Sequence, residues 1–275
     1  MTAPRYPCYH SENIEAVQIK RTIGQTLKTV EKAITILELF TREHPWMGVT
    51  EIANQLGLHK GTVHLILNTL RRSGYIVFNA DTRKYGLGFK LRDLAERVSY
   101  RHDFRDLCLP RMVVLARDSA EDISLSIPID NNWVIIAVAQ GTQFVRQDIR
   151  LGRTLPLYCG AGGRCILAFM KAERTERLLE EAPLVAHTEH TIIDKTVLSA
   201  SLAEIRRNRY AVGSEEYYRD AAAVSFPLFD RQQSILGSCT IHSTVSRMDA
   251  AFTRRLIALG SAASAEMNET LRGVG

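Results

Sequence analysis

Residues 49–86 read VTEIANQLGLHKGTVHLILNTLRRSGYIVFNADTRKYG, and this stretch decides the fold of the amino-terminal part of the chain. Thr50 is a favourable N-cap before Glu51, which complements the positive end of a helix, and Gly57 supplies a left-handed stop. In the next helix, apolar side chains recur at i, i+3, i+4 and i+7, namely Val63, Ile66, Leu67 and Leu70. Two short helices with a tight connection predict a helix-turn-helix.

A predicted β-hairpin follows the second helix, which Ser73-Gly74 ends. Residues 75–78 are aromatic or β-branched, as strands favour, and residues 79–82 are turn residues before the charged pair Arg83-Lys84. Upstream, a further amphipathic helix is indicated by Leu27, Val30, Ile34, Leu37 and Phe40. Three helices and a hairpin with a basic tip predict a winged helix-turn-helix over residues 25–88.

The second helix presents short, polar and basic side chains opposite its apolar face, and an α-helix fits the major groove of DNA. We expect the DNA-facing residues to be Lys60, Gly61, Thr62, His64, Leu65, Asn68, Arg71, Arg72, Arg83 and Lys84. The last four are expected on phosphates, and an ordinary solvated face is the alternative for them. Helix spacing alone favours DNA binding weakly, because enzymes also contain such helix pairs.

Six segments carry a resemblance to a known family. They are LKTVEKAITILELF (27–40), VTEIANQLGLHKGTVHLILNTLRRSGYI (49–76), KYGLGFKLRDLA (84–95), GRTLPLYCGAGGRCILAF (152–169), IRRNRYAVGSEEYYRDAAAVSFPLFD (205–230) and ILGSCTIHSTVSRMD (235–249). In this order they resemble the isocitrate lyase regulator (IclR) family of bacterial transcription factors, over residues 26–272. The resemblance implies a DNA-binding regulator with a GAF-like effector-binding domain, assembled as a homodimer and often as a homotetramer.

Length and composition agree with two domains, because 275 residues exceed a typical single domain and 45% hydrophobic residues suffice for two cores. We expect an α+β protein with four parts. They are a flexible extension (1–24), the winged helix-turn-helix (25–88), a linker helix (89–105) and the effector-binding domain (106–275). In the last part we expect an antiparallel sheet with strands at 123–129, 133–140 and 223–229, flanked by helices at 161–171, 173–181, 195–208 and 248–271.

The glycine-rich segment 159–163 (CGAGG) is the candidate lining of an effector pocket, because backbone with small side chains lets a ligand approach and offers N–H donors to a carboxylate. The resemblance implies pocket residues at Gly160, Ala161, Gly213, Ala223, Thr240 and His242, and Tyr158 is a candidate for an apolar wall or for plain core. Glu215 to Tyr218 are expected to form an exposed turn near the pocket mouth.

The pocket positions depart from the family pattern, which often has an acidic residue, a cysteine or serine and two serines where this chain has Gly213, Ala223, Thr240 and His242. Fewer hydroxyls and more volume imply a bulkier, less polar effector, such as an aromatic or longer-chain carboxylic acid that His242 or Thr240 hydrogen-bonds. An ordinary sheet histidine paired to a neighbour is the alternative for His242.

The predicted recognition helix departs as well, since many members have an arginine where this chain has Leu65. Arginine is the commonest reader of guanine, so base reading is left to Lys60, Thr62, His64 and Asn68, and Leu65 suits a thymine methyl group. We therefore expect an A·T-rich half-site. A partly palindromic operator requires paired readers, and the apolar faces of residues 26–40 and 89–105 are candidates for pairing.

Composition narrows the remaining functions. A net charge of +5 suits a polyanionic partner, and five cysteines without a CxxC pair argue against a disulfide framework or a zinc site. No apolar run reaches the length of a membrane span, and the first 25 residues lack the apolar centre of a signal peptide, so a cytoplasmic protein without membrane contact is expected. The segment from His187 to His190 is better explained as a loop than as a metal site.

The sequence favours a ligand-responsive regulator of catabolic genes, and two other functions are alternatives to it. In the first, the second domain of a DNA-binding regulator serves only to form oligomers. The second is a nucleotide-dependent dehydrogenase, since Gly160-x-Gly162 begins a dinucleotide fingerprint, but Cys165 occupies the third glycine position. The sequence contains neither a nucleophile elbow nor a Walker loop, so we expect no enzymatic activity, no catalytic residues and no cofactor.

Overall fold

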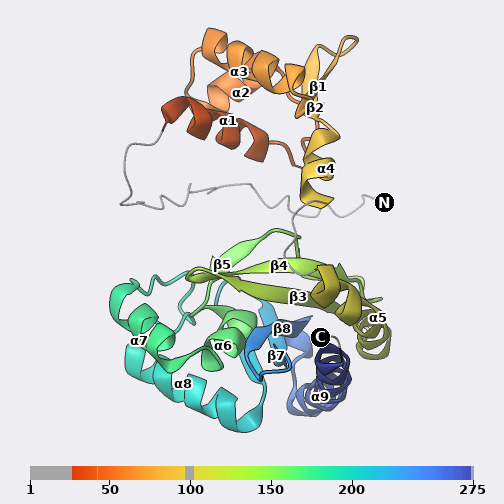
Figure 1. Cartoon of the computed structure of the whole chain (residues 1–275), viewed down its shortest axis with the longest axis vertical. Coiled ribbons are helices and arrows are strands. Elements are labelled where there is room, and N and C mark those ends of the chain that lie inside the picture. The colour runs from red at the N-terminus through yellow and green to blue at the C-terminus, as the bar shows by residue number, and fades with distance from the viewer. Residues whose placement is uncertain (1–26, 42, 97–101, 274–275) are drawn as a thin grey trace, which may run out of the picture. The chain divides into compact units, whose positions relative to one another are not determined.

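The computed structural model describes residues 27–41, 43–96 and 102–273 (Figure 1). The chain forms two compact units, residues 1–99 and residues 100–275. The predicted extension 1–24 lies outside the described residues. No helix of the described ranges combines the length and the apolar character that crossing a membrane requires.

The first unit is a winged helix-turn-helix, as predicted. Its elements are α1 (Lys28–Glu38), α2 (Val49–Leu56), α3 (Lys60–Arg72), β1 (Ile76–Asn79), β2 (Lys84–Leu87) and α4 (Lys90–Glu96). The two strands pair antiparallel, and Met47 adds an isolated bridge to Tyr85. The core that joins the three helices to the hairpin is formed by Ile36, Phe40, Met47, Ile52, Ala53, Val63, Ile66, Leu67, Ile76 and Tyr85.

The start of α2 differs from the prediction. Gly48, with an extended backbone, is the N-cap, and its N–H donates to the Glu51 carboxylate over 3.3 Å. Thr50 lies within the first turn, so the N-cap prediction at this residue is wrong by two positions. Gly57 has a φ of +61° and ends α2 as predicted, because its N–H can then reach the last carbonyls of the helix.

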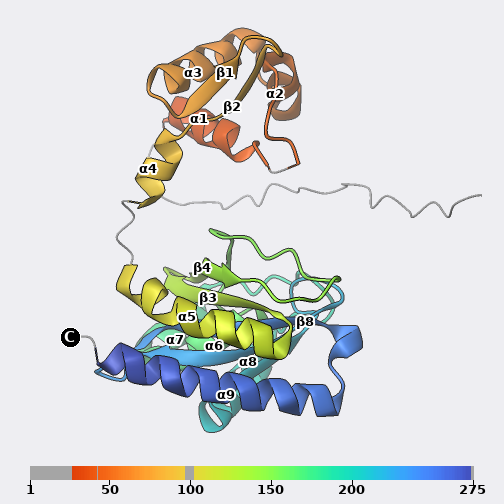
Figure 2. The same ribbon diagram turned by 90° about the vertical axis from the view of Figure 1, so that its right-hand side faces the viewer.

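The second unit is an α+β domain built on one six-stranded sheet (Figures 1 and 2). Its elements are α5 (His102–Ser119), β3 (Asp122–Ile129), β4 (Asn132–Ala139), β5 (Thr154–Pro156), α6 (Gly160–Ala168), α7 (Ala172–Glu181), α8 (Lys195–Asn208), β6 (Ala211–Ser214), β7 (Ala221–Phe229), β8 (Ile235–Thr244), the 3-10 turn η1 (Val245–Arg247) and α9 (Ala250–Arg272). The strand order is β5-β4-β3-β8-β7-β6, and every neighbouring pair is antiparallel.

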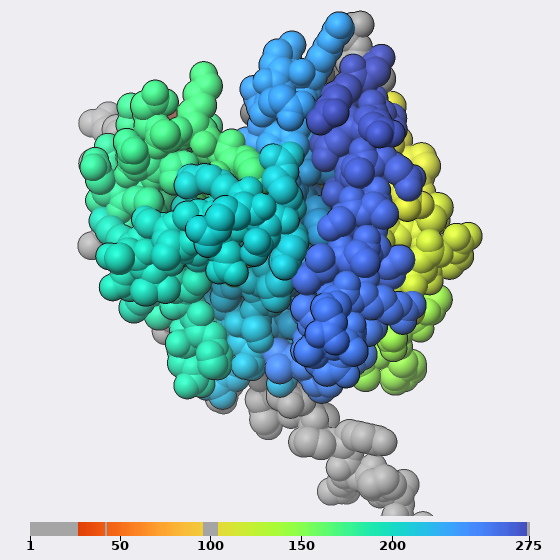
Figure 3. Space-filling model, turned by 90° about the horizontal axis from the view of Figure 1, so that it is seen from below, coloured from red at the N-terminus to blue at the C-terminus, as the bar shows by residue number. Residues whose placement is uncertain are grey.

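The two faces of this sheet carry different side chains. One face is covered by α5 and α9, which lie side by side, as Figure 3 shows for α9 in blue and α5 in yellow. It bears large apolar residues, among them Ile123, Leu125, Val224, Phe226 and Ile241. The opposite face bears small polar residues, among them Ser124, Ser126, Ser225, Ser238 and Thr240, and packs on α6. Small side chains on this face leave room for a pocket.

The linker helix predicted for residues 89–105 is covered only in part by the described residues. α4 ends at Glu96, α5 begins at His102, and residues 97–101 lie outside the described residues. α5 then continues to Ser119, so residues 106–119 form a helix that the sequence did not predict. Its buried face, including Phe104, Cys108, Met112 and Leu115, packs in the core of the second unit. Pro110, which lacks an N–H donor, lies inside this helix and interrupts the sequence signal.

Candidate DNA-reading surface and effector pocket

The predicted recognition helix is α3, and its polar face is accessible. Val63, Ile66 and Leu67 are buried in the core of the first unit, which turns the opposite side of the helix outward. The exposed residues of α3 that the sequence selected are Lys60, Gly61, His64, Leu65, Arg71 and Arg72, while Thr62 and Asn68 are partly exposed. Within the helix, the Asn68 amide and the His64 imidazole lie 3.2 Å apart in a hydrogen bond.

The hairpin supplies the other two selected residues, Arg83 and Lys84, which are exposed at its tip and at the start of β2. The tip is fixed by Asn79, whose side-chain oxygen accepts hydrogen bonds from the N–H groups of Asp81 and Thr82, both over 3.0 Å. The end of α3 adjoins the hairpin, because the Arg71 guanidinium lies 5.9 Å from the centre of the Phe78 ring. All ten selected residues thus belong to α3 and the hairpin.

The second unit contains a cavity of about 450 Å³ between the small-residue face of the sheet and the segments around it. Six of the seven selected pocket residues line it, and they are Gly160, Ala161, Gly213, Ala223, Thr240 and His242. Tyr158 does not line it, so its placement in a pocket wall is wrong. The Tyr158 hydroxyl donates to the Val185 carbonyl and accepts from the Val185 N–H, which holds the buried ring against a different segment.

The glycine-rich segment 159–163 leads into α6, which begins one residue before the helix predicted at 161–171. Gly160, with a φ of +76°, is the first residue of α6. The Trp133 indole packs on this helix and donates to the carbonyls of Pro156 and Cys159 over 3.2 and 3.3 Å. A Cβ on Gly163 would come within 2.6 Å of the indole nitrogen. Close packing of Trp133 therefore requires glycine at position 163, whether or not a ligand approaches this segment.

Glu216 is buried, with 6% of its surface exposed, and the prediction of an exposed turn at this residue is wrong. Its carboxylate accepts hydrogen bonds from the Arg164 guanidinium and, over 2.9 Å, from the Gly160 N–H at the start of α6. Arg164 also donates to the Ser201 hydroxyl and the Val212 carbonyl. The protein itself thus supplies a carboxylate to the helix N-terminus at which the sequence placed a ligand.

The two polar residues predicted at the pocket each have a protein partner. The hydroxyls of Thr240 and Ser225 lie 2.9 Å apart, and His242 Nε2 lies 2.7 Å from the Ser124 hydroxyl. Burial lowers the pKa of His242 from 6.5 to about 4. At neutral pH this imidazole is uncharged and offers the pocket a hydrogen bond but no positive charge.

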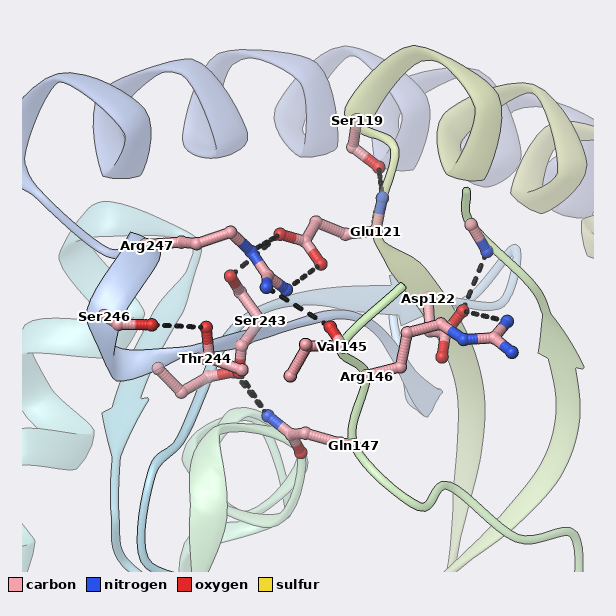
Figure 4. A network of polar contacts seen from close by, with 12 residues as sticks. Ser119, Glu121, Asp122, Val145, Arg146, Gln147, Ser243, Thr244, Ser246 and Arg247 are labelled. Carbon is pink, nitrogen blue, oxygen red and sulfur yellow. Dashed lines mark hydrogen bonds and ion pairs between the residues drawn. The ribbon is translucent and has the colours of Figure 1, made fainter. Parts of the chain in front are cut away.

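The segment 140–153, between β4 and β5, forms one side of the pocket and is tied to the sheet (Figure 4). The Gln147 amide donates to the carbonyls of Ala222 and Ser243, and Arg247 donates to the Val145 carbonyl over 3.2 Å. Arg247 in turn forms two 2.8 Å contacts with the buried Glu121 carboxylate. These contacts hold the segment against β7, β8 and η1.

Arg153 also lines the pocket, although the sequence analysis did not select it. Its guanidinium lies 4.4 Å from the centre of the Tyr218 ring and 5.8 Å from that of Tyr217. Burial lowers the pKa of Arg153, and the nearby Tyr217 and Asp148 partly oppose this shift. Arg153 lies in the segment GRTLPLYCGAGGRCILAF (152–169), but Tyr217 and Tyr218 belong to a loop more than 60 residues further along the chain. The spacing of residues in the sequence therefore did not indicate that these side chains meet.

Both units match families of known proteins. Residues 29–80 match the family described as IclR helix-turn-helix domain, and residues 96–268 match the family described as Bacterial transcriptional regulator IclR C-terminal.

The chain belongs to the IclR family.

Relatives along most of the chain support this assignment to the IclR family. The HTH-type transcriptional regulator XynR of Escherichia coli (strain K12) is 29% identical over 223 residues, which cover 81% of this chain and 88% of XynR. A solved IclR regulator from Alicyclobacillus acidocaldarius superposes with a TM-score of 0.72 at 26% identity, over 90% of this chain and 99% of that one. An IclR homolog from Microbacterium hydrocarbonoxydans, solved in complex with 4-hydroxybenzoate, shares the fold, with a TM-score of 0.74 at 20% identity over 89% of this chain and 99% of that one.

As an IclR-family member, the chain is a DNA-binding transcription regulator with two domains and not an enzyme. The dehydrogenase interpretation of Gly160-x-Gly162 is therefore wrong. The structure gives the physical reason, since these glycines pack against Trp133 and the start of α6 binds Glu216. In the predicted loop from His187 to His190, the first imidazole stacks on Tyr217 and the second lies 3.3 Å from the Glu215 carboxylate.

Proposed function

We propose that this regulator controls transcription of catabolic genes in response to a small organic carboxylic acid. The acid, aromatic or otherwise bulky, binds in the cavity of the second unit. The observation that carries the proposal is the 450 Å³ cavity, on which six residues selected from the sequence converge. A cavity of this size that combines apolar walls with polar groups is typical of small-molecule sites. The homolog solved with 4-hydroxybenzoate supports an aromatic acid as the ligand class.

The lining supports a ligand with a bulky apolar part. Trp133, Ile135 and Leu155 contribute large apolar walls, while Gly213 and Ala223 leave volume open. Burying such surface contributes about 25 cal/mol per Å² of apolar area removed from water. The lining contains three arginines and four acidic residues, and of the acidic residues Glu216 is already paired with Arg164 and Asp148 with Arg150.

For the DNA side, we propose that α3 enters the major groove of a partly palindromic, A·T-rich operator and that the hairpin contacts phosphates. This proposal is supported by the accessible face of α3, on which Thr62, His64 and Asn68 lie beside the exposed Leu65. Two-fold operators require two readers, so a homodimer is proposed as the DNA-binding form, with a tetramer as a further assembly.

Control requires that the acid bind two arrangements of the protein with different affinity, because a ligand shifts an equilibrium only by its differential affinity. We propose that residues 89–105, which connect the two units along the chain, carry this change. The proposal rests on the chain connection alone.

The test combines two measurements on the full-length protein. Thermal unfolding is followed against a panel of aromatic and longer-chain carboxylic acids, and affinity for the DNA upstream of the gene is followed by fluorescence anisotropy. The proposal expects an acid that raises the melting temperature and changes DNA affinity. Acids that leave both quantities unchanged would indicate a second domain that serves only to form oligomers.

Two variants locate the effect. Ala223→Leu fills the cavity and is expected to abolish the response to the acid, since Ala223 lines it. Ala200→Leu, at an exposed alanine of α8, adds the same bulk outside the cavity and is expected to respond like the wild type. An undiminished response of Ala223→Leu would contradict binding in this cavity.

A further inference from the structure

Arg153 is a cation of the pocket whose guanidinium forms no hydrogen bond or ion pair with a carboxylate in the described contacts, although the Asp148 carboxylate lies near enough to raise its pKa. One of its terminal nitrogens donates to the backbone carbonyl of Asp148 over 3.1 Å. The Asp148 carboxylate is engaged elsewhere, since Arg150 donates to it over 2.7 Å. A guanidinium has five N–H donors in a planar fork. Arg153 therefore retains donors that the described contacts of the protein do not use.

The other two cations of the lining are less suited to a buried anion. Arg146 lies 3.6 Å from the Asp122 carboxylate, which also accepts the Gly141 N–H over 2.8 Å. Arg219 is exposed, and water screens its charge. Arg153 is partly buried, so an anion at its guanidinium is attracted more strongly.

The Arg153 guanidinium is also held in place. The rings of Tyr218 and Tyr217 lie 4.4 and 5.8 Å from it and contact each other, and Tyr217 in turn packs on His187 with ring centres 4.4 Å apart. Cation–π contacts orient the fork without consuming its hydrogen-bond donors. A fork held in one orientation is suited to bidentate binding of a carboxylate.

Apolar surface begins directly beside this cation. Leu155 follows two residues later along the same extended segment, and side chains two apart in a strand lie on the same face. On the neighbouring strand, the Ile135 N–H donates to the Arg153 carbonyl over 3.1 Å, and Ile135 also lines the cavity. The pocket thus offers a cation at one edge and an apolar wall next to it.

Two alternative positions for a ligand carboxylate are disfavoured. At the start of α6 the Glu216 carboxylate already accepts the Gly160 N–H, and a second carboxylate there would be repelled. His242 is uncharged at neutral pH, for the reason given above. It can bind a polar atom of the ligand but does not offset a negative charge.

Building on the proposed function, we infer that the Arg153 guanidinium binds the carboxylate of the effector, with the apolar part of the molecule against Trp133, Ile135 and Leu155. The ligand class is a carboxylate attached to a ring or to a longer hydrocarbon chain. Arg153 is then the residue that makes the pocket selective for acids over neutral analogues of the same shape.

The experiment uses the intrinsic fluorescence of Trp133, which lines the pocket. The chain has two tryptophans, and Trp46→Phe in the full-length protein leaves Trp133 as the sole reporter. The probes are 4-hydroxybenzoate with its amide and hexanoate with its amide, so that each pair differs mainly in charge. Arg153→Gln is expected to weaken acid binding about 10- to 100-fold, as loss of a charge-assisted hydrogen bond does, and to leave amide binding unchanged.

Matched variants separate recognition from structure. Arg231→Gln removes an exposed cation on the turn between β7 and β8, outside the cavity lining, and is expected to bind both acids like the parent. Tyr218→Leu removes a ring that holds the guanidinium and is expected to weaken acid binding about two- to five-fold, while Tyr218→Phe, which keeps the ring, restores it. These tyrosine variants test the inference even if Arg153→Gln fails to fold.

The outcomes distinguish the inference from the proposed function. Equal acid affinity in Arg153→Gln and the parent overturns the inference, and so does a parent that binds each amide as tightly as its acid. If the acids still change DNA affinity in that case, the proposed function stands. If Arg153→Gln selectively loses acid binding but bound acid leaves the DNA affinity of the parent unchanged, the inference stands and the proposed function fails. Binding of neither probe pair overturns both.

Discussion

The polar face of α3 and the pocket of the second unit differ in how far their polar side chains are already paired within the protein. On α3 the selected residues are accessible, and their contacts are light, such as the 3.2 Å hydrogen bond between His64 and Asn68. In the pocket Glu216, Thr240 and His242 are buried, and each is hydrogen-bonded to the protein.

This difference predicts that DNA binding and folding stability can be changed separately on α3, whereas ligand binding and folding stability are coupled in the pocket. Accessible groups with few contacts can be replaced at little cost to folding, so their loss should appear in DNA binding alone. Buried, bonded groups contribute to folding, so replacing them changes stability before it changes ligand binding. Four predictions test this comparison.

The largest effect is expected for Glu216→Gln. It leaves the Arg164 guanidinium, 4% exposed, without its charged partner, and breaking a buried pair typically costs about 3–5 kcal/mol. The free energy of unfolding is measured in urea through Trp133 fluorescence in the Trp46→Phe background, which reports on the second unit.

The control is Glu215→Gln, at the adjacent residue. Glu215 lies 3.3 Å from His190, whose side chain is 52% exposed, and such surface pairs contribute about 0–1 kcal/mol. Similar losses for the two variants would mean that the buried pair is not the stabilising feature we describe.

A smaller effect, confined to DNA binding, is expected for Asn68→Ala. Loss of a base contact costs about 1–3 kcal/mol of binding free energy, while the stability of the first unit should change little because Asn68 is partly exposed. Anisotropy with operator DNA and thermal unfolding are measured on the same samples. Unchanged DNA affinity would exclude a base contact by Asn68.

The sequence predicted the first unit well because its signals are local. The apolar spacing of Val63, Ile66 and Leu67, and the left-handed Gly57, specify the helices whatever the rest of the chain does. Even there, the N-cap was misplaced, since a glycine with extended backbone replaced the side-chain cap that Thr50 suggested. Caps depend on backbone conformation that residue type only biases.

The glycine-rich segment was selected from its residues alone, whereas the other pocket positions were predicted only where a family pattern supplied them. The buried ion pair joins Arg164 to Glu216, 52 residues apart, and the Arg153 contacts join two loops of the second unit. Such pairs depend on strand order, which no local periodicity encodes. α5 was missed for a different reason, because Pro110 interrupts its helical pattern.

The third prediction concerns His242, from which we expect a dependence of stability on pH that is about half as large as the effect of Asn68→Ala on DNA binding. Its folded-state pKa of about 4 lies below the ordinary 6.5, so the unfolded chain binds the proton more tightly. The stability is fully present above about pH 6.5 and is lost as the pH falls toward 4. Between about pH 7 and about pH 5.5 the loss should be about 1 kcal/mol, and His242→Gln should remove that part of the slope.

Urea unfolding at both pH values, again followed through Trp133, measures the slope. His190→Gln is the control, since it removes a more exposed histidine of the same unit. If His242→Gln and the parent lost the same stability on acidification, the buried, uncharged state of His242 would be wrong.

The smallest effect per experiment is expected at the hairpin, where Arg83 and Lys84 are exposed. A phosphate contact releases counterions, so each of Arg83→Ala and Lys84→Ala should reduce the slope of log affinity against log salt by about one unit. One unit corresponds to about 0.4 kcal/mol for each twofold change in salt, which single affinities hardly resolve. A salt series therefore measures it, with Arg231→Ala, on the exposed hairpin turn of the second unit, as a matched control. If all three variants had the same slope as the parent, Arg83 and Lys84 would belong to a solvated face. The exposed cations of the first unit would then contribute no more to DNA binding than Arg231 of the second unit.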